Sequence, residues 1–106
     1  MTKAMFAVGI AAALVAAPSH APAERPARVE IKDFMYGPRE ITVPAGTPVT
    51  WTNHDEEPHT ITSATGAFGS TGLSHDETFT QTFPQPGTYA YFCALHPQMR
   101  ATVVVR

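Results

Sequence analysis

Apolar and polar residues alternate with a period of two along most of the chain after residue 27. Such alternation is typical of β-strands that bury one face, and turn-forming Pro and Gly residues separate the runs. No run after residue 27 keeps a helical period of 3.6 residues over the length of a helix. We therefore predict strands over residues 28–34, 40–43, 48–53, 59–63, 77–83, 87–93 and 101–105.

Seven or eight short strands with frequent turns predict an all-β fold, built as a sandwich of two sheets. The apolar member of each alternation is expected to face the space between the sheets. This rule gives a predicted core of Val29, Ile31, Ile41, Val43, Val49, Trp51, Ile61, Phe79, Phe83, Tyr89, Tyr91, Val103 and Val105.

The N-terminal segment follows a different pattern. Lys3 provides a positive start, residues 4–17 are almost wholly apolar, and small residues and prolines follow. This order predicts a secretory signal peptide over residues 1–23, with the cleavage site left open, and hence a periplasmic protein. An uncleaved anchor is the alternative, but spanning a membrane takes about 20 apolar residues. Residues 24–27 are then a linker, and 28–106 form one domain.

Charge and cysteine content narrow the possible functions. The formal net charge is −2, and removal of the signal makes it −3 because Lys3 is the only charged residue lost. No basic cluster indicates nucleic-acid binding. A single cysteine excludes a disulfide within the chain, although a domain this small benefits from an additional stabilising element such as a metal.

The lone cysteine lies in the stretch "CALHPQM", which places Cys93, His96 and Met99 at intervals of three residues. An exposed thiol is vulnerable to oxidation in an oxidising compartment unless it is buried or bound to a metal. A thiolate, an imidazole and a thioether on one loop between two strands are soft or borderline ligands that suit copper. A buried structural cysteine is the simpler alternative.

A trigonal copper site requires a second histidine. His59 follows Pro58 and begins a β-like run, so its position is the best defined of the remaining histidines. His54 and His75 lie in polar turns and are expected to be solvated, while His20 lies in the signal region. The predicted ligands are therefore His59, Cys93, His96 and, as a weak axial ligand, Met99.

The segments "WTNHDEEPHTIT" and "YFCALHPQMRATVVV" together resemble the cupredoxins, and within them the amicyanin-like and small plastocyanin-like copper proteins. The resemblance implies a Greek-key sandwich over residues 28–106 with one type 1 copper ion. It also implies a supporting role for Asn53 and an N–H bond from Thr60 to the Cys93 sulfur. Two positions depart from the family pattern: Thr60 replaces an Asn, and Ala94 replaces a polar residue.

The resemblance implies a monomeric electron carrier rather than an enzyme. Its partners would be redox proteins such as a c-type cytochrome or a dehydrogenase. The predicted docking face is an apolar patch around His96, flanked by the acidic run 55–57, which would ordinarily be a solvated turn. The patch is expected to comprise Met35, Pro58, Phe68, Leu95 and Pro97.

Two other functions are open at this point. A protein for copper trafficking or storage would use the same ligands, but the predicted mature chain has only two methionines, Met35 and Met99. A thiol enzyme would use Cys93 as nucleophile, which requires an open cleft and an orienting third residue.

Overall fold

The computed structural model describes residues 27–106, so the predicted signal peptide and most of the predicted linker lie outside the described residues. All regular elements in this part of the chain are strands. No helix there has the length and apolar character needed to cross a membrane. The strands are β1 (Ala27–Lys32), β2 (Met35–Gly37), β3 (Glu40–Val43), β4 (Pro48–Asn53), β5 (Thr62–Ser63), β6 (Thr78–Thr82), β7 (Gly87–Cys93) and β8 (His96–Val105).

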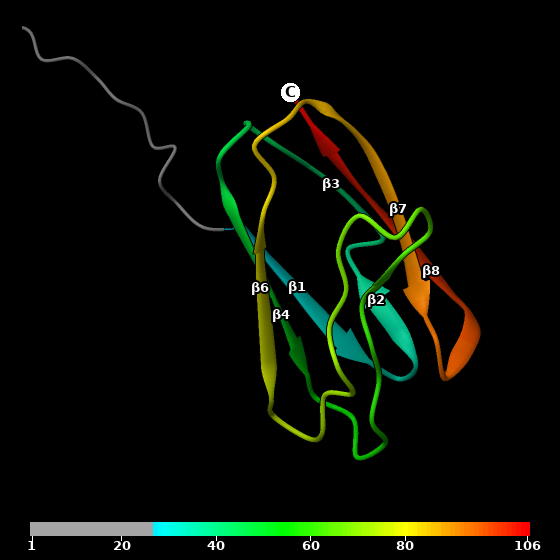
Figure 1. Cartoon of the computed structure of the whole chain (residues 1–106). Coiled ribbons are helices and arrows are strands. Elements are labelled where there is room, and N and C mark those ends of the chain that lie inside the picture. Colours follow the sequence, from blue (N-terminus) through cyan, green and yellow to red (C-terminus); the bar gives the residue numbers. More distant parts are fainter. Residues whose placement is uncertain (1–26) are drawn as a thin grey trace, which may run out of the picture.

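The eight strands form two four-stranded sheets packed as a sandwich (Figure 1). One sheet has the order β2-β1-β4-β6 and the other the order β3-β8-β7-β5. Each sheet is mixed: β1 pairs with β4 and β3 pairs with β8 in parallel, while the other neighbours are antiparallel. The predicted all-β sandwich of seven or eight strands is confirmed.

Agreement between the predicted and observed strands is closest where alternation is regular. Strands β3, β4 and β7 have the predicted bounds. The predicted strand 59–63 shortens to β5, because His59 makes only an isolated bridge with Leu73. The prediction of a loop from Cys93 to Ala101 is wrong, since β8 already begins at His96. Strand β2 was missed because its three residues are too few to show a period.

The predicted core is confirmed in its main part. Ten of its thirteen members are buried, and Ile41, Phe79 and Tyr89 pack against them while remaining partly exposed. The polar ends of the core aromatics are satisfied, because Trp51 Nε1 donates to Tyr91 Oη over 3.0 Å and Tyr36 Oη donates to the Thr60 carbonyl over 2.5 Å. Burial raises the pKa of Tyr91 to about 12, so this hydroxyl remains a neutral donor and acceptor.

One end of the sandwich gathers three segments that are far apart in the sequence. The β1–β2 turn, the segment after β4 and the β7–β8 turn all lie at the lower end of Figure 1. Side-chain contacts between Phe34, His59 and His96 confirm that the three segments meet there. We call this end the metal pole, because it carries the predicted ligands.

Candidate metal centre

A tight β-hairpin positions Cys93 and His96. Cys93 ends β7, His96 begins β8, and the two residues pair across the two-residue turn Ala94–Leu95. Residues directly opposite each other in an antiparallel pair project to the same side. A register shift between Phe92, which pairs with Arg100, and Cys93 brings Cys93 opposite His96. The Cys93 Sγ consequently lies 3.6 Å from His96 Nδ1.

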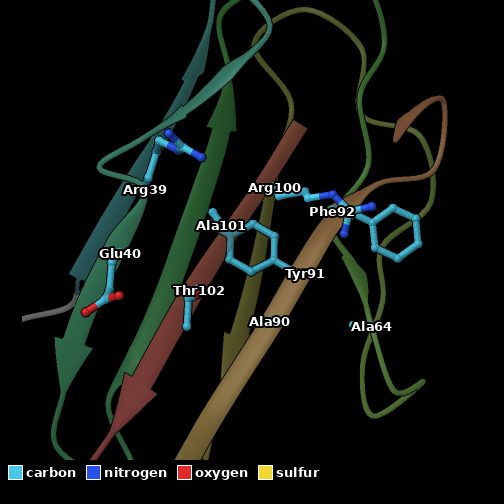
Figure 2. A pocket seen from close by; sticks show the side chains of 9 residues that line it. All are labelled: Arg39, Glu40, Ala64, Ala90, Tyr91, Phe92, Arg100, Ala101 and Thr102. Carbon is cyan, nitrogen blue, oxygen red and sulfur yellow. The ribbon is translucent and has the colours of Figure 1, made fainter. Parts of the chain in front are cut away.

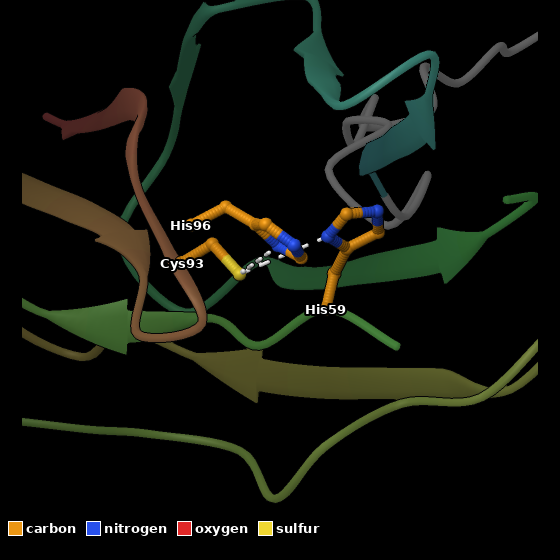
Figure 3. Close-up of side chains that lie close together, drawn as sticks. All are labelled: His59, Cys93 and His96. Atoms are coloured by element: carbon orange, nitrogen blue, oxygen red, sulfur yellow. Dashed lines mark hydrogen bonds between the residues drawn. The ribbon is translucent and has the colours of Figure 1, made fainter. Parts of the chain in front are cut away.

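His59 completes the group from a distant part of the chain. It lies between β4 and β5, and its Nδ1 is 3.8 Å from Cys93 Sγ (Figure 3). One ligand atom from each of His59, Cys93 and His96 lies within 4.8 Å of the other two. His59 and Cys93 are fully buried, whereas His96 is partly exposed.

These separations fit ligands of one metal ion. Metal–nitrogen and metal–sulfur bonds of about 2.0–2.3 Å in a trigonal arrangement place two ligand atoms about 3.5–4 Å apart. The distances of 3.6 and 3.8 Å from Cys93 Sγ to the two imidazole nitrogens fall in that range. A thiol with two imidazoles is a donor set for a soft or borderline ion, copper among them.

The far side of the His59 ring is held by a carboxylate. His59 Nε2 lies 2.9 Å from Asp55 Oδ2, which leaves Nδ1 facing the sulfur. The Asp55 carboxylate also accepts the backbone N–H groups of Asp33 and Phe34 over 2.7 and 2.9 Å. Burial by itself would raise the pKa of Asp55, but the N–H bonds from Phe34 and Asp33 and the contact with His59 lower it below its ordinary value.

The prediction that the acidic run 55–57 forms a rim beside the docking face is therefore wrong for Asp55. Its side chain is only 10% exposed, because it turns inward to His59 and to the β1–β2 turn. Glu56, with a side chain that is 83% exposed, and Glu57 do remain at the surface. The acidic rim of the metal pole consequently consists of Glu56 and Glu57 without Asp55.

Thr60 fixes the cysteine side of the group with two bonds. Its backbone N–H points to Cys93 Sγ over 3.4 Å, as the family resemblance implied. Its side-chain Oγ1 accepts the N–H of Ala94 over 2.8 Å, so it ties the histidine segment to the hairpin turn. The sequence pattern does not predict the bond between the Ala94 N–H and Thr60 Oγ1. The feature that points to it is the Thr at a position where the family pattern has Asn.

Asn53 supports the histidine segment rather than the cysteine hairpin. It is fully buried, its Nδ2 donates to the carbonyls of Glu57 and Leu73 over 2.9 and 2.8 Å, and its Oδ1 accepts the N–H of Asp55 over 2.9 Å. The supporting role implied by the resemblance is thus present as bonds to two loops. These bonds set the path of the chain from the end of β4 to His59.

The other predicted ligands and histidines are placed as follows. Met99 is 4% exposed and belongs to the buried core, on the inward face of β8 three residues after His96. His54 pairs with Glu30 at the surface and His75 is about half exposed, so both are outside the three-residue group, as expected. His20 lies outside the described residues.

The surface around His96 is apolar, but its composition differs in part from the prediction. Met35 and Leu95 are 58% and 53% exposed, as predicted, and Phe34 joins them at 39%. Placing Phe68 in this patch was wrong, because its ring packs on Phe83 with a centroid separation of 5.1 Å. For Phe68, packing of the ring against the core aromatics is more favourable than exposing it at the surface.

A separate hollow of about 430 Å³ lies on the outer face of the sheet β3-β8-β7-β5 (Figure 2). Small side chains such as Ala64 and Ala90 leave this space between Arg39, Arg100 and Phe92. None of the three clustered residues lines it. Cys93 is itself fully buried, which disfavours the thiol-enzyme alternative, because that alternative requires an accessible nucleophile.

Two facing mixed sheets with a largely buried His-Cys-His group at one pole are the arrangement of a small metalloprotein of the β-sandwich class. The family model described as the cupredoxin-like domain matches residues 5–105 of the chain. The chain therefore belongs to the cupredoxin-like domain family, and the predicted resemblance is confirmed.

Curated relatives and solved structures agree with this assignment. Amicyanin-alpha of Methylorubrum extorquens is 34% identical over 110 residues, covering 96% of this chain and 92% of that protein. Amicyanin of Paracoccus denitrificans is 35% identical over 82 residues, covering 73% of this chain but only 63% of its own length. The reduced Cu(I) form of an amicyanin mutant at pH 4 superimposes with a TM-score of 0.74 at 30% identity, covering 78% of this chain and 84% of that one.

Proposed function

We propose that the protein is an electron carrier that binds one type 1 copper ion through His59, Cys93 and His96, with Met99 as a weak axial ligand. The observation that carries the proposal is the convergence of three ligand atoms within 4.8 Å at one pole of the sandwich. The family membership and the Cu(I) form of the similar amicyanin support copper as the ion. Bound copper would supply one-electron chemistry between Cu(II) and Cu(I).

The chain's own contribution is to hold the donor atoms in one arrangement. Asp55 fixes the orientation of the His59 ring, and the N–H of Thr60 points to the Cys93 sulfur. The two-residue hairpin turn ties Cys93 to His96. Because these groups are held by bonds outside the donor set, little has to move when an electron arrives or leaves.

Partner docking is proposed to occur at the metal pole. His96 is the partly exposed member of the group, and the apolar side chains of Phe34, Met35 and Leu95 surround that region. Glu56 and Glu57 add negative charge beside the patch, which suits a redox partner with a basic rim, such as a c-type cytochrome or a dehydrogenase. We further propose that the protein acts as a monomer in the periplasm, after removal of a signal peptide at residues 1–23.

The visible and EPR spectra of the copper-loaded chain test this proposal. Type 1 copper is expected to give an intense charge-transfer band from the Cys93 thiolate and a narrow copper hyperfine splitting. Cys93→Ser should abolish the band while the β-sheet circular dichroism remains. Weak and readily exchanged copper without that band would instead favour the trafficking or storage alternative, and absence of copper binding would reject both.

A further inference from the structure

The turn between β1 and β2 has a backbone conformation that requires support. Asp33 and Phe34 both have positive φ values, 56° and 60°, although neither is a glycine. Positive φ at both positions is the type I′ geometry of a two-residue hairpin, but the second position usually holds Gly, and a Phe side chain is disfavoured there. Their two N–H groups are both accepted by the carboxylate of Asp55, over 2.7 and 2.9 Å. Asp55 therefore holds this turn in its unusual shape.

The turn places the Phe34 ring against both imidazoles of the metal centre. The ring centroid lies 4.9 Å from that of His59 and 4.8 Å from that of His96, with interplanar angles of 85° and 83°. The two imidazoles are themselves 4.9 Å apart, so the three rings form one mutually contacting group. Edge-to-face contacts of this kind are favourable and directional.

Core packing does not explain the position of Phe34. Its side chain is 39% exposed, and it is absent from the buried core and from the residues that pack against it. Instead it is connected to the ligands twice, through ring contacts and through Asp55. The same oxygen, Oδ2, accepts the N–H of Phe34 and lies 2.9 Å from His59 Nε2.

We propose that Phe34 is a positioning residue of the metal centre, held by Asp55, and that its ring fixes both imidazoles before the metal binds. This inference rests on the proposed function for the identity of the metal, but the ring contacts belong to the chain alone. It predicts that His96, whose ring otherwise contacts only the Cys93 sulfur and the His59 ring among these residues, loses its fixed orientation when the Phe34 ring is removed. Metal release should then be faster.

Three variants of the purified protein test the role of the ring. Phe34→Leu removes the aromatic ring and keeps an apolar side chain, while Phe34→Tyr retains the ring. Phe68→Leu is the matched control, because Phe68 is another partly buried aromatic that contacts Phe83 and Tyr89 and neither imidazole. We expect Cu(I) transfer to excess chelator to accelerate about tenfold in Phe34→Leu, and less than about twofold in the other two variants.

The metal-free protein provides a second readout that does not depend on copper. Imidazole NMR signals of His59 and His96 should be sharp in the parent and in Phe68→Leu. Those of His96 should broaden or average in Phe34→Leu. Asp55→Asn should also broaden the His96 signals, although Asp55 bonds to His59 and to the β1–β2 turn rather than to His96. Because the His59 ring also contacts His96, an effect on His96 in this variant is assigned to Phe34 only when it matches the effect of Phe34→Leu.

The outcomes separate this inference from the proposed function. Equal release rates and equally sharp His96 signals in Phe34→Leu and Phe68→Leu would overturn it, leaving Phe34 as part of the apolar docking face only. If the parent protein binds no copper, the proposed function fails. The metal-free comparison would still show whether Phe34 orders the two imidazoles.

Discussion

Thr60 connects the two segments that supply the clustered ligands. It follows His59 directly, and its N–H and Oγ1 reach Cys93 and Ala94 across the metal pole. Its hydroxyl also forms a hydrogen bond with the Thr62 hydroxyl over 2.8 Å, so Thr60 Oγ1 has two partners. A single residue thus fixes the distance between the histidine segment and the cysteine hairpin.

Replacing Thr60 by Val should weaken the fold and disturb the site together. The isosteric side chain removes the acceptor of the Ala94 N–H, and loss of a part-buried hydrogen bond of this kind costs about 0.5–1.5 kcal/mol. We expect urea unfolding of the metal-free protein to show this loss of stability. The EPR spectrum of the copper-loaded variant should differ from that of the parent. Thr60→Ser should restore both. Thr50→Val, which removes a Thr–Thr hydroxyl bond on the sheet surface, should leave the spectrum unchanged.

The residues that the sequence failed to reveal share one property. Ligand spacing identified Cys93 and His96 because both lie on one hairpin, and Pro58 drew attention to His59. In contrast, Asp55 and Phe34 interact across 21 positions of sequence, and Thr60 and Ala94 across 34. Local patterns carry no information on such pairs, because only the packing of two sheets brings them together.

At the scale of elements, Asn53 joins the end of β4 to two loops, the segment between β4 and β5 and the loop between β5 and β6. Its amide donates to the Glu57 and Leu73 carbonyls, and Leu73 in turn exchanges two backbone bonds with His59. His59 therefore has a fixed backbone position although it belongs to no regular strand. An amide is suited to this position, since it provides donors and an acceptor at once.

Asn53→Asp should be strongly destabilising despite its nearly identical shape. A carboxylate loses both donated bonds and faces two carbonyl oxygens in a fully buried position, which should cost more than about 3 kcal/mol at neutral pH. Chemical unfolding of the metal-free protein measures this loss. Gln81→Glu, the same exchange of amide for acid on the surface of β6, is the control and should cost less than about 0.5 kcal/mol. Similar losses in both variants would contradict the role of Asn53.

His75 links the same two loops at the surface and predicts a dependence on pH. The hydrogen bond from His75 to the Asp55 carbonyl, over 3.2 Å, raises the pKa of His75. Desolvation lowers this pKa, but the nearby carboxylates of Asp76 and Glu56 raise it further. A raised pKa in the folded state gives stability that is complete below the unfolded value of about 6.5 and disappears as the pH rises through the folded value.

The melting temperature of the parent protein should therefore exceed that of the His75→Gln variant at about pH 5.5, and the difference should vanish by about pH 8.5. Salt should reduce the difference, since His75 and its acidic neighbours are exposed. His54→Gln is a suitable comparison because His54 pairs with a different strand, through Glu30 of β1. A difference between parent and His75→Gln that is independent of pH would reject this account.

Regular elements were predictable in proportion to their length and alternation. Strands β4 and β7, with six and seven residues, show a clear period of two and were predicted with their observed bounds. The two-residue β5 and three-residue β2 are defined by their pairing partners rather than by their own sequence. The early start of β8 depends on the two-residue hairpin, which places Pro97 in a strand that it would otherwise interrupt.

At the scale of the whole molecule, the kinds of charged side chain differ from one face to another. The exposed Glu56 and Glu57 lie next to the metal pole, while Arg39, Arg100 and Glu40 line the hollow on the outer face of the β3-β8-β7-β5 sheet. The net charge of −2 is too small to steer a partner by itself. The local distribution therefore determines which face a charged partner meets first.

This distribution predicts which acidic residue affects electron transfer to a basic partner. At an ionic strength of about 0.1 M, charges act over about 10 Å, so only those beside the docking face should matter. We expect Glu57→Gln to lower the second-order rate with a basic c-type cytochrome about twofold to threefold, measured by stopped flow. Glu40→Gln removes an equal charge from the sheet face that carries the hollow, so it should leave the rate unchanged. Because both variants change the net charge equally, equal effects would mean that total charge, and not docking at the metal pole, governs the encounter.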